Sequence, residues 1–98
     1  MQLDKLIEKY DKLGEIKFYD FIIVYSIKNS LINEKISPEM YLLYYHDNLL
    51  KLYRKTNNNK YLELAKLLRR AAHKVYRIYL KNNLINKNDR FLNILVWV

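Results

Sequence analysis

The sequence predicts a single all-α domain, residues 1–98, folded as a small bundle of four or five helices. Apolar side chains recur at intervals of three and four residues along most of the chain, the spacing of a helix with one buried face. No turn sequence typical of a strand hairpin separates these segments. Hydrophobic residues make up 51% of the 98, which is enough for one core and excludes a disordered chain.

The first two helices are expected on either side of Gly14. Helical spacing covers residues 2–13, and Gly14 follows where a left-handed helix end favours a residue without a Cβ. Residues 15–31 come next and are apolar nearly all round between 18 and 27. The β-branched residues there would suit a buried strand, whereas the length of the segment and its helical neighbours favour a buried helix.

The next two helices have clearer ends. Ser37 offers an N-cap hydroxyl and Pro38 suits the first helical position, so a helix is predicted from Pro38 to about Lys55. Residues 56–59 form a short polar connection, with Asn59 as the expected cap of the next helix. That helix, at about 60–82, is long, basic and amphipathic.

Scarce residue types exclude several kinds of site. Without Cys the chain has no disulfide, thiolate nucleophile or Cys-ligated zinc, and one Gly is too few for a phosphate-binding loop. His46 and His73 lie in no catalytic or metal-binding spacing and are expected to be surface or satisfied side chains. We therefore expect no enzyme activity, no cofactor and no metal.

Charge is distributed unequally between the halves of the chain. Residues 1–49 carry eight acids and six lysines, a net charge of −2, whereas residues 50–98 carry two acids and twelve bases, a net charge of +10. Between Lys51 and Lys81, ten bases accompany one acid, Glu63. This asymmetry indicates a surface that faces a polyanion.

The bases of the 60–82 helix form a stripe opposite its apolar face. From Lys66 to Lys81 the stripe is about 22 Å long, enough to lie along several phosphates. A solvated outer face is the alternative, but such a face usually mixes charges of both signs. The predicted nucleic-acid contacts are Lys66, Arg69, Arg70, His73, Lys74, Arg77 and Lys81, with Arg54 and Lys55 from the preceding helix.

Tyrosines near these bases could stack on nucleic-acid bases or belong to the core. Tyr45 and Tyr79 share the apolar faces and are predicted to be core residues, while the roles of Tyr41, Tyr44 and Tyr53 stay open. Helices 38–55 and 60–82 are too long for a typical helix-turn-helix. An antiparallel helical hairpin is the geometry we predict.

The chain ends on an apolar segment. Residues 82–89 are predicted to be a loop, and Asp89 can cap residues 90–98, for which helix and strand both stay open. Seven of the last eight residues are apolar, a patch that soluble monomers avoid exposing. The tail either folds back as the last core element or docks on a neighbouring subunit, and we expect the second, a homo-oligomer with this tail in or beside the interface. The predicted interface residues are Phe91, Leu92, Leu95 and Trp97.

The length and amino-acid composition of the whole chain resemble those of small proteins of archaeal viruses from hot springs. The resemblance rests on short length, absence of Cys and abundance of Lys, Ile, Asn and Tyr, and it carries over no site residue. Several proteins of that kind are helical capsid or nucleoprotein subunits that wrap DNA. The resemblance therefore implies a viral protein, a nucleoprotein or virion subunit, located in the cytoplasm or in the virion.

Two functions follow as expectations. The first is a non-enzymatic nucleic-acid-binding protein that contacts phosphates without reading sequence. The second is an oligomeric structural or adaptor protein whose basic face binds an acidic protein; binding to an anionic membrane surface ranks below both. A transmembrane segment is not expected, because no run of consecutive apolar residues, Phe21–Tyr25 included, approaches about 20 residues.

Overall fold

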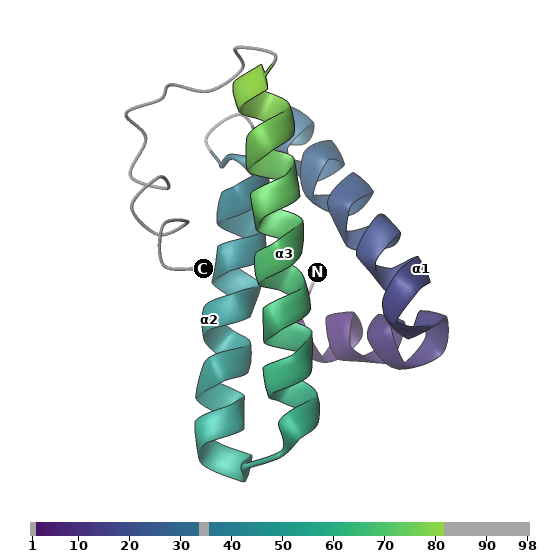
Figure 1. Ribbon diagram of the computed structural model, residues 1–98, viewed down its shortest axis with the longest axis vertical. Coiled ribbons are helices and arrows are strands. Elements are labelled where there is room, and N and C mark those ends of the chain that lie inside the picture. Colours follow the sequence, from purple (N-terminus) through teal and green to yellow (C-terminus); the bar gives the residue numbers. More distant parts are fainter. Residues whose placement is uncertain (1, 34–35, 82–98) are drawn as a thin grey trace.

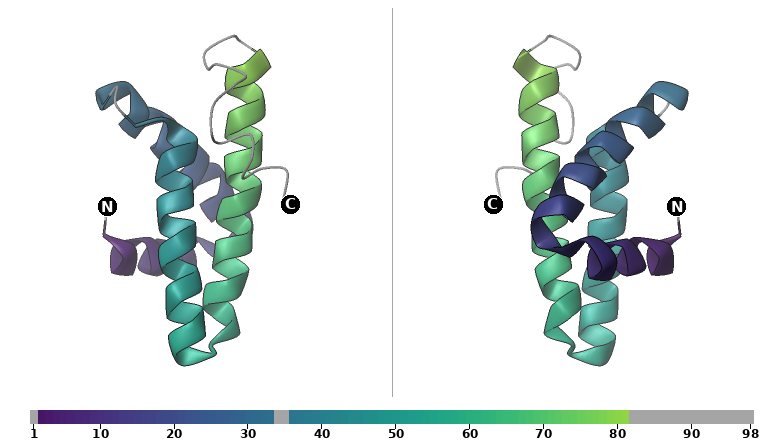
Figure 2. Two further views of the ribbon diagram at one scale, coloured as in Figure 1. Left: turned by 90° about the vertical axis from the view of Figure 1, so that its left-hand side faces the viewer. Right: turned by 90° about the vertical axis from the view of Figure 1, so that its right-hand side faces the viewer.

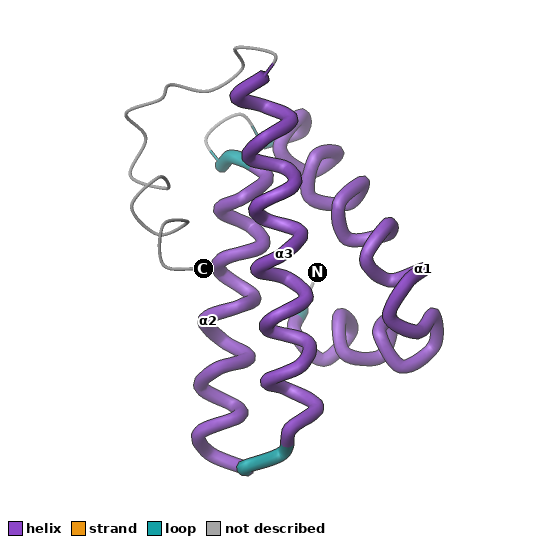
Figure 3. Tube along the Cα trace, in the orientation of Figure 1, coloured by secondary structure: helices purple, strands orange, loops and turns teal. Residues whose placement is uncertain are grey.

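The computed structural model describes residues 2–33 and 36–81, without the side chains of Tyr79 and Leu80. Its helices are α1 (Leu3–Ile32), α2 (Pro38–Thr56) and α3 (Asn59–Lys81). α2 and α3 lie side by side as an antiparallel hairpin, and α1 crosses this pair (Figure 1). Figure 3 shows no strand in the described part of the chain, so the all-α prediction is confirmed and residues 18–27 are helical.

Gly14 divides α1 into two differently directed parts. Its backbone, at φ 80° and ψ 171°, is not helical, although helical residues flank it on both sides. Figure 2 shows the sharp change of direction between the two parts. The predicted break at this residue is confirmed.

The number of helices differs from the four or five that we predicted. α1 includes both stretches predicted as separate helices, 2–13 and 15–31, because they join directly at Gly14 without a connecting loop. The described residues therefore contain three helices. The expected loop at 82–89 and the last segment, 90–98, lie outside the described residues.

Aromatic side chains connect the two parts of α1 across the bend. The ring of Tyr10 meets that of Phe18 edge to face at a centroid distance of 5.5 Å, and Phe18 is fully buried. Phe21 lies 6.0 Å from Phe18 and stacks on Tyr25 at 5.8 Å. These separations fall within the range of favourable aromatic pairs. The Tyr10–Phe18 contact holds the first part of α1 against the second, and the other two continue the aromatic cluster along the second part.

The start of α2 confirms the predicted boundary but not the predicted hydrogen bond. Ser37 has the extended backbone of an N-cap residue and Pro38 is the first helical residue. The Ser37 hydroxyl makes no capping hydrogen bond. Its carbonyl oxygen instead accepts the N–H groups of Met40 and Tyr41, at 3.1 and 3.4 Å, which starts the helix without side-chain help.

The turn between α2 and α3 uses consecutive asparagines. Asn57 adopts the left-handed conformation, at φ 56°, and its N–H donates to the carbonyl of Tyr53 at 2.7 Å. The Asn58 side-chain oxygen accepts the N–H of Lys60 at 3.0 Å and so caps α3. The predicted cap, Asn59, is one residue too late, because α3 already begins at Asn59.

The core lies where the three helices meet, and α3 contributes most to it. The described side chains of the predicted apolar face of α3 are buried, but the buried part of the helix is wider than predicted, because α1 and α2 both pack against it. Pro38 and Leu42 show the same deep burial on α2. No helix in the described ranges is both long and apolar enough to cross a bilayer. The buried residues of α3 are Leu64, Ala65, Leu67, Leu68, Ala71, Ala72, Val75 and Tyr76.

The Gly14→Ala substitution should destabilise the fold by about 1–3 kcal/mol, because this φ,ψ region is essentially restricted to glycine. A Cβ at this position would meet no atom within 4 Å, so the cost is conformational and not steric. Urea denaturation monitored by circular dichroism measures it. Lys17→Ala, at an exposed helical position, is the control and should stay within about 0.5 kcal/mol. An equally stable Gly14→Ala variant would contradict the bend.

Candidate nucleic-acid interface

One side of α3 presents a row of cations to solvent. The five residues Lys66, Arg70, Lys74, Arg77 and Lys81 are all exposed, over a helix length of about 22 Å. This confirms the predicted outward orientation of the stripe for five of its seven members. The row is called the α3 ridge below. The other two members, Arg69 and His73, are only partly exposed.

Acids of α1 neutralise part of the cationic surface near the start of α3. The carboxylate of Asp11 lies 2.7 Å from Nζ of Lys60, and that of Glu15 lies 2.9 Å from a guanidinium nitrogen of Arg70. The four side chains are between 37% and 62% exposed, so each pair contributes little to stability. The pairs matter more for charge, because they compensate cations that the sequence alone presents as unpaired.

The phenol of Tyr10 reports the acidic character of the same region. Its pKa is raised, chiefly by burial and then by the carboxylates of Glu15, Glu63 and Asp11. The ammonium group of Lys60 acts in the opposite direction. The end of the molecule where α3 begins is thus a mixed-charge region and not a uniformly basic one.

Arg69 is engaged by α2. A guanidinium nitrogen lies 2.9 Å from Nε2 of His46, and Nδ1 of the same ring lies 3.0 Å from the carboxylate of Asp47. A guanidinium has no acceptor atom, so Nε2 must accept and Nδ1 must donate to Asp47. These two hydrogen bonds fix the His46 tautomer that carries hydrogen on Nδ1 and join Arg69 to α2. His46 is thus a satisfied side chain, as predicted, and one nitrogen of the partly exposed Arg69 guanidinium is already engaged by α2.

His73 was predicted to be a surface or satisfied side chain and a member of the cationic stripe, and its arrangement matches neither prediction. Its Nε2 atom is buried and has no hydrogen-bond partner, so the side chain is neither fully satisfied nor presented to solvent as a contact. Its pKa is lowered, first by burial and then by the charges of Arg77 and Arg69. His73 is therefore neutral at physiological pH and adds no positive charge to the site. Its projected position, at the edge of the stripe, left this outcome to the packing of the helices.

The C-terminal end of the α3 ridge borders a hollow between α3 and α1. The hollow measures about 480 Å³ and is open to solvent. The ammonium group of Lys74 lies 5.7 Å from the ring centroid of Tyr19, a residue that sequence analysis did not single out. No acid is among the described residues that line the hollow. We call this hollow the Tyr19 hollow, and the residues that line it are Tyr19, Lys74, Arg77, Ile78 and Lys81.

A second hollow on the other side of Tyr19 has a different character. It measures about 350 Å³ and brings together two acids, Glu15 and Asp20, with one base, Arg70. Ile16 and Leu67 complete its described lining. Tyr19 therefore stands between a mixed-charge hollow and one whose charged residues, among those the structure describes, are all cations. A polyanion would be favoured only on the cationic side.

Arg54 and Lys55 are exposed but lie apart from the Tyr19 hollow. Both occupy the last turn of α2, where positive charge is favourable at the negative end of the helix dipole. Because α2 and α3 are antiparallel, this turn lies beside the start of α3 (Figure 1). The structure therefore separates these two predicted contacts from Arg77 and Lys81.

The tyrosines divide between core and surface. Tyr45 is buried, as predicted, and burial is the main cause that raises its pKa to about 12. Its neighbour Tyr44 is 66% exposed, and the two rings meet edge to face at a centroid distance of 5.6 Å. The other predicted core tyrosine, Tyr79, has its side chain outside the description.

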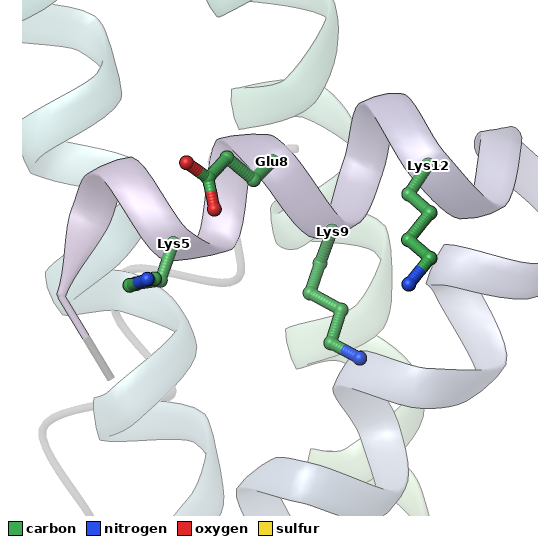
Figure 4. A pocket seen from close by; sticks show the side chains of 4 residues that line it. All are labelled: Lys5, Glu8, Lys9 and Lys12. Carbon is green, nitrogen blue, oxygen red and sulfur yellow. The ribbon is translucent and has the colours of Figure 1, made fainter.

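The first part of α1 carries a further cluster of lysines. A hollow of about 370 Å³ is lined by Lys5, Glu8, Lys9 and Lys12, which come from successive turns of this part (Figure 4). The ammonium group of Lys9 lies 5.2 Å from the Phe21 ring. A carboxylate among three lysines is typical of a solvated face. Among the described residues, no three His, Asp or Glu side chains are grouped so that they could hold a metal ion.

Stability should fall as the pH is lowered from 7.5 to 5.5, and His73 should contribute to this fall. Its folded-state pKa lies below the usual 6.5, so protons bind the unfolded chain first and favour unfolding as the pH passes through 6.5 and downward. Urea midpoints at three pH values measure the effect. His73→Gln should reduce this pH dependence, whereas an unchanged dependence would contradict the burial of the ring.

No protein-family model matches the chain, and neither a curated protein nor a solved structure matches it. The charges and contacts of its own side chains therefore carry the functional proposal that follows.

Proposed function

We propose that the protein binds nucleic acid without catalysing a reaction, and that the α3 ridge contacts phosphates without reading the base sequence. The observation that supports this most directly is the exposure of all five ridge cations along one helix. Their alignment matches the regular negative charge of a nucleic-acid backbone, and release of counterions would drive binding. A nucleoprotein or virion subunit is one form that such a protein takes.

The cations at the end of α3 are the strongest candidates within the ridge. Arg70 is paired with Glu15, whereas Lys66, Arg77 and Lys81 form no ion pair within the described part of the chain. Arg77 and Lys81 also line the Tyr19 hollow, whose described lining has no acid. The charged side chains that a phosphate would meet there, among the described residues, are all positive. We therefore place the centre of the site at the last two turns of α3.

Binding to random-sequence duplex DNA should weaken steeply with salt. Four or five phosphate contacts correspond to a log–log slope of roughly −3.5 to −4.5. The double substitution Arg77→Glu and Lys81→Glu should lower affinity at least tenfold and make the slope shallower by about two. Filter-binding titrations at several salt concentrations measure both quantities.

The matched control is Lys5→Glu with Lys12→Glu, which changes the net charge equally on the first part of α1. This control should lose less than about threefold in affinity, because its lysines lie away from the α3 ridge. Equal losses in the two double variants would show that binding follows net charge alone. That result, or no binding by the unmodified protein, would overturn the proposal.

A second candidate function is an oligomeric structural or adaptor protein that meets an acidic partner through the same cations. Exposed apolar side chains on the second part of α1 favour it, since Val24 is 64% and Leu31 73% exposed. Such side chains are typical of surfaces that pair with another chain. The tail residues predicted for an interface lie outside the described residues and stay a prediction. Light scattering tests it: Val24→Glu with Leu31→Glu should dissociate the oligomer, and a monomeric unmodified protein would contradict it.

A further inference from the structure

We propose that the Tyr19 hollow binds single-stranded nucleic acid, with a base stacked on the Tyr19 ring and the adjoining phosphates held by Lys74, Arg77 and Lys81. This inference rests on the proposed function and names its ligand. Proteins that bind single strands combine a cationic groove with aromatic side chains on which bases stack. The Tyr19 hollow brings these two components together from α1 and α3.

The Tyr19 ring provides the stacking surface. Its ring borders the hollow, and the Lys74 ammonium lies over it at 5.7 Å from the centroid. Tyr19 is half-buried against the core, but this face of its ring is covered by the exposed Lys74 side chain, so a base could take this position while the ammonium moves to a phosphate. Ile78, 37% exposed, adds an apolar lining surface beside the ring. An apolar neighbour suits the flat face of a base more than it suits a phosphate.

The charges on the two sides of Tyr19 fix where the phosphates would lie. Two acids and one base, Glu15, Asp20 and Arg70, line the hollow on one side, whereas three cations line the Tyr19 hollow on the other. Phosphates would therefore be disfavoured in the hollow that contains Glu15 and Asp20 and drawn into the Tyr19 hollow. A strand whose base stacks on Tyr19 would run its backbone along Lys74, Arg77 and Lys81.

The dimensions favour a single strand over a duplex. Lys74, Arg77 and Lys81 share one side of α3 and span about 10 Å, much less than the roughly 34 Å of one duplex turn. A duplex also hides the faces of its bases in the stack, so it could use the cations but not the Tyr19 ring. An aromatic surface among cations is thus useful only for unpaired bases.

The experiment compares a labelled oligothymidine with a duplex of equal length in fluorescence anisotropy titrations. Tyr19→Leu should weaken single-strand binding about 5- to 100-fold, the range expected for one lost base–aromatic stack, and change duplex binding less than about threefold. Tyr19→Phe keeps the ring and should bind the single strand within about twofold of the original. Tyr44→Leu, at an exposed tyrosine on α2, is the matched control and should bind as the unmodified protein does.

Photocrosslinking provides a second test, which uses the unmodified protein and so does not depend on the folding of a variant. An oligonucleotide carrying iodouracil should crosslink to Tyr19 of the unmodified protein, as mapped by mass spectrometry. Crosslinks only to other tyrosines, or equal single-strand affinity of a folded Tyr19→Leu variant, would overturn this inference. If Arg77→Glu with Lys81→Glu still weakens binding in that case, the proposed function stands without the stacking site. If neither nucleic acid binds the unmodified protein, both proposals fail.

Discussion

The bend at Gly14 is the constraint on which the rest of the structure depends. A glycine-only backbone conformation turns the chain within α1, and the contact between Tyr10 and Phe18 closes the angle. Because of this bend, α1 presents residues from both of its parts to α3 and does not extend past it. Asp11, before the bend, and Glu15, after it, can therefore both reach α3.

This placement divides the basic surface of α3 into two regions. Near the start of α3, the acids of α1 compensate Lys60 and Arg70. Toward the end of α3, Arg77 and Lys81 remain exposed, without ion pairs among the described residues, beside the Tyr19 ring. A helix that is evenly basic in sequence thus becomes a directional surface. The proposed function and the proposed single-strand site both depend on this difference between the two regions.

Sequence reasoning predicted the features that local chemistry controls. The bend at Gly14, the start of α2 at Pro38 and the outward side of α3 each follow from a backbone restriction or from helical periodicity. Contacts between distant residues did not follow, because periodicity gives the exposed face of a helix but not the helix that lies against it. The ion pairs of α1 with α3 join residues 49 and 55 positions apart.

The same limit explains the errors in the predicted site. Arg69 and His73 lie at one edge of the stripe, where the neighbouring helix decides between exposure and burial. His46 of α2 contacts Arg69 at that edge, and the Nε2 atom of His73 is buried there. Tyr19 was not among the predicted site residues, because its sequence neighbours gave no sign of a binding site. It lies in a segment that is apolar nearly all round, and only the crossing of α1 over α3 leaves its ring beside the cations.

The substitution Glu15→Gln tests most directly whether acids of α1 mask part of a nucleic-acid-binding surface. It should release Arg70 and so raise affinity for random-sequence DNA about 2- to 5-fold, with a log–log salt slope steeper by about one. Glu8→Gln removes the same charge away from α3 and should change affinity less. The free energy of unfolding should change by less than about 0.5 kcal/mol in either variant. Affinity that stays the same or falls in a folded Glu15→Gln variant would contradict the account.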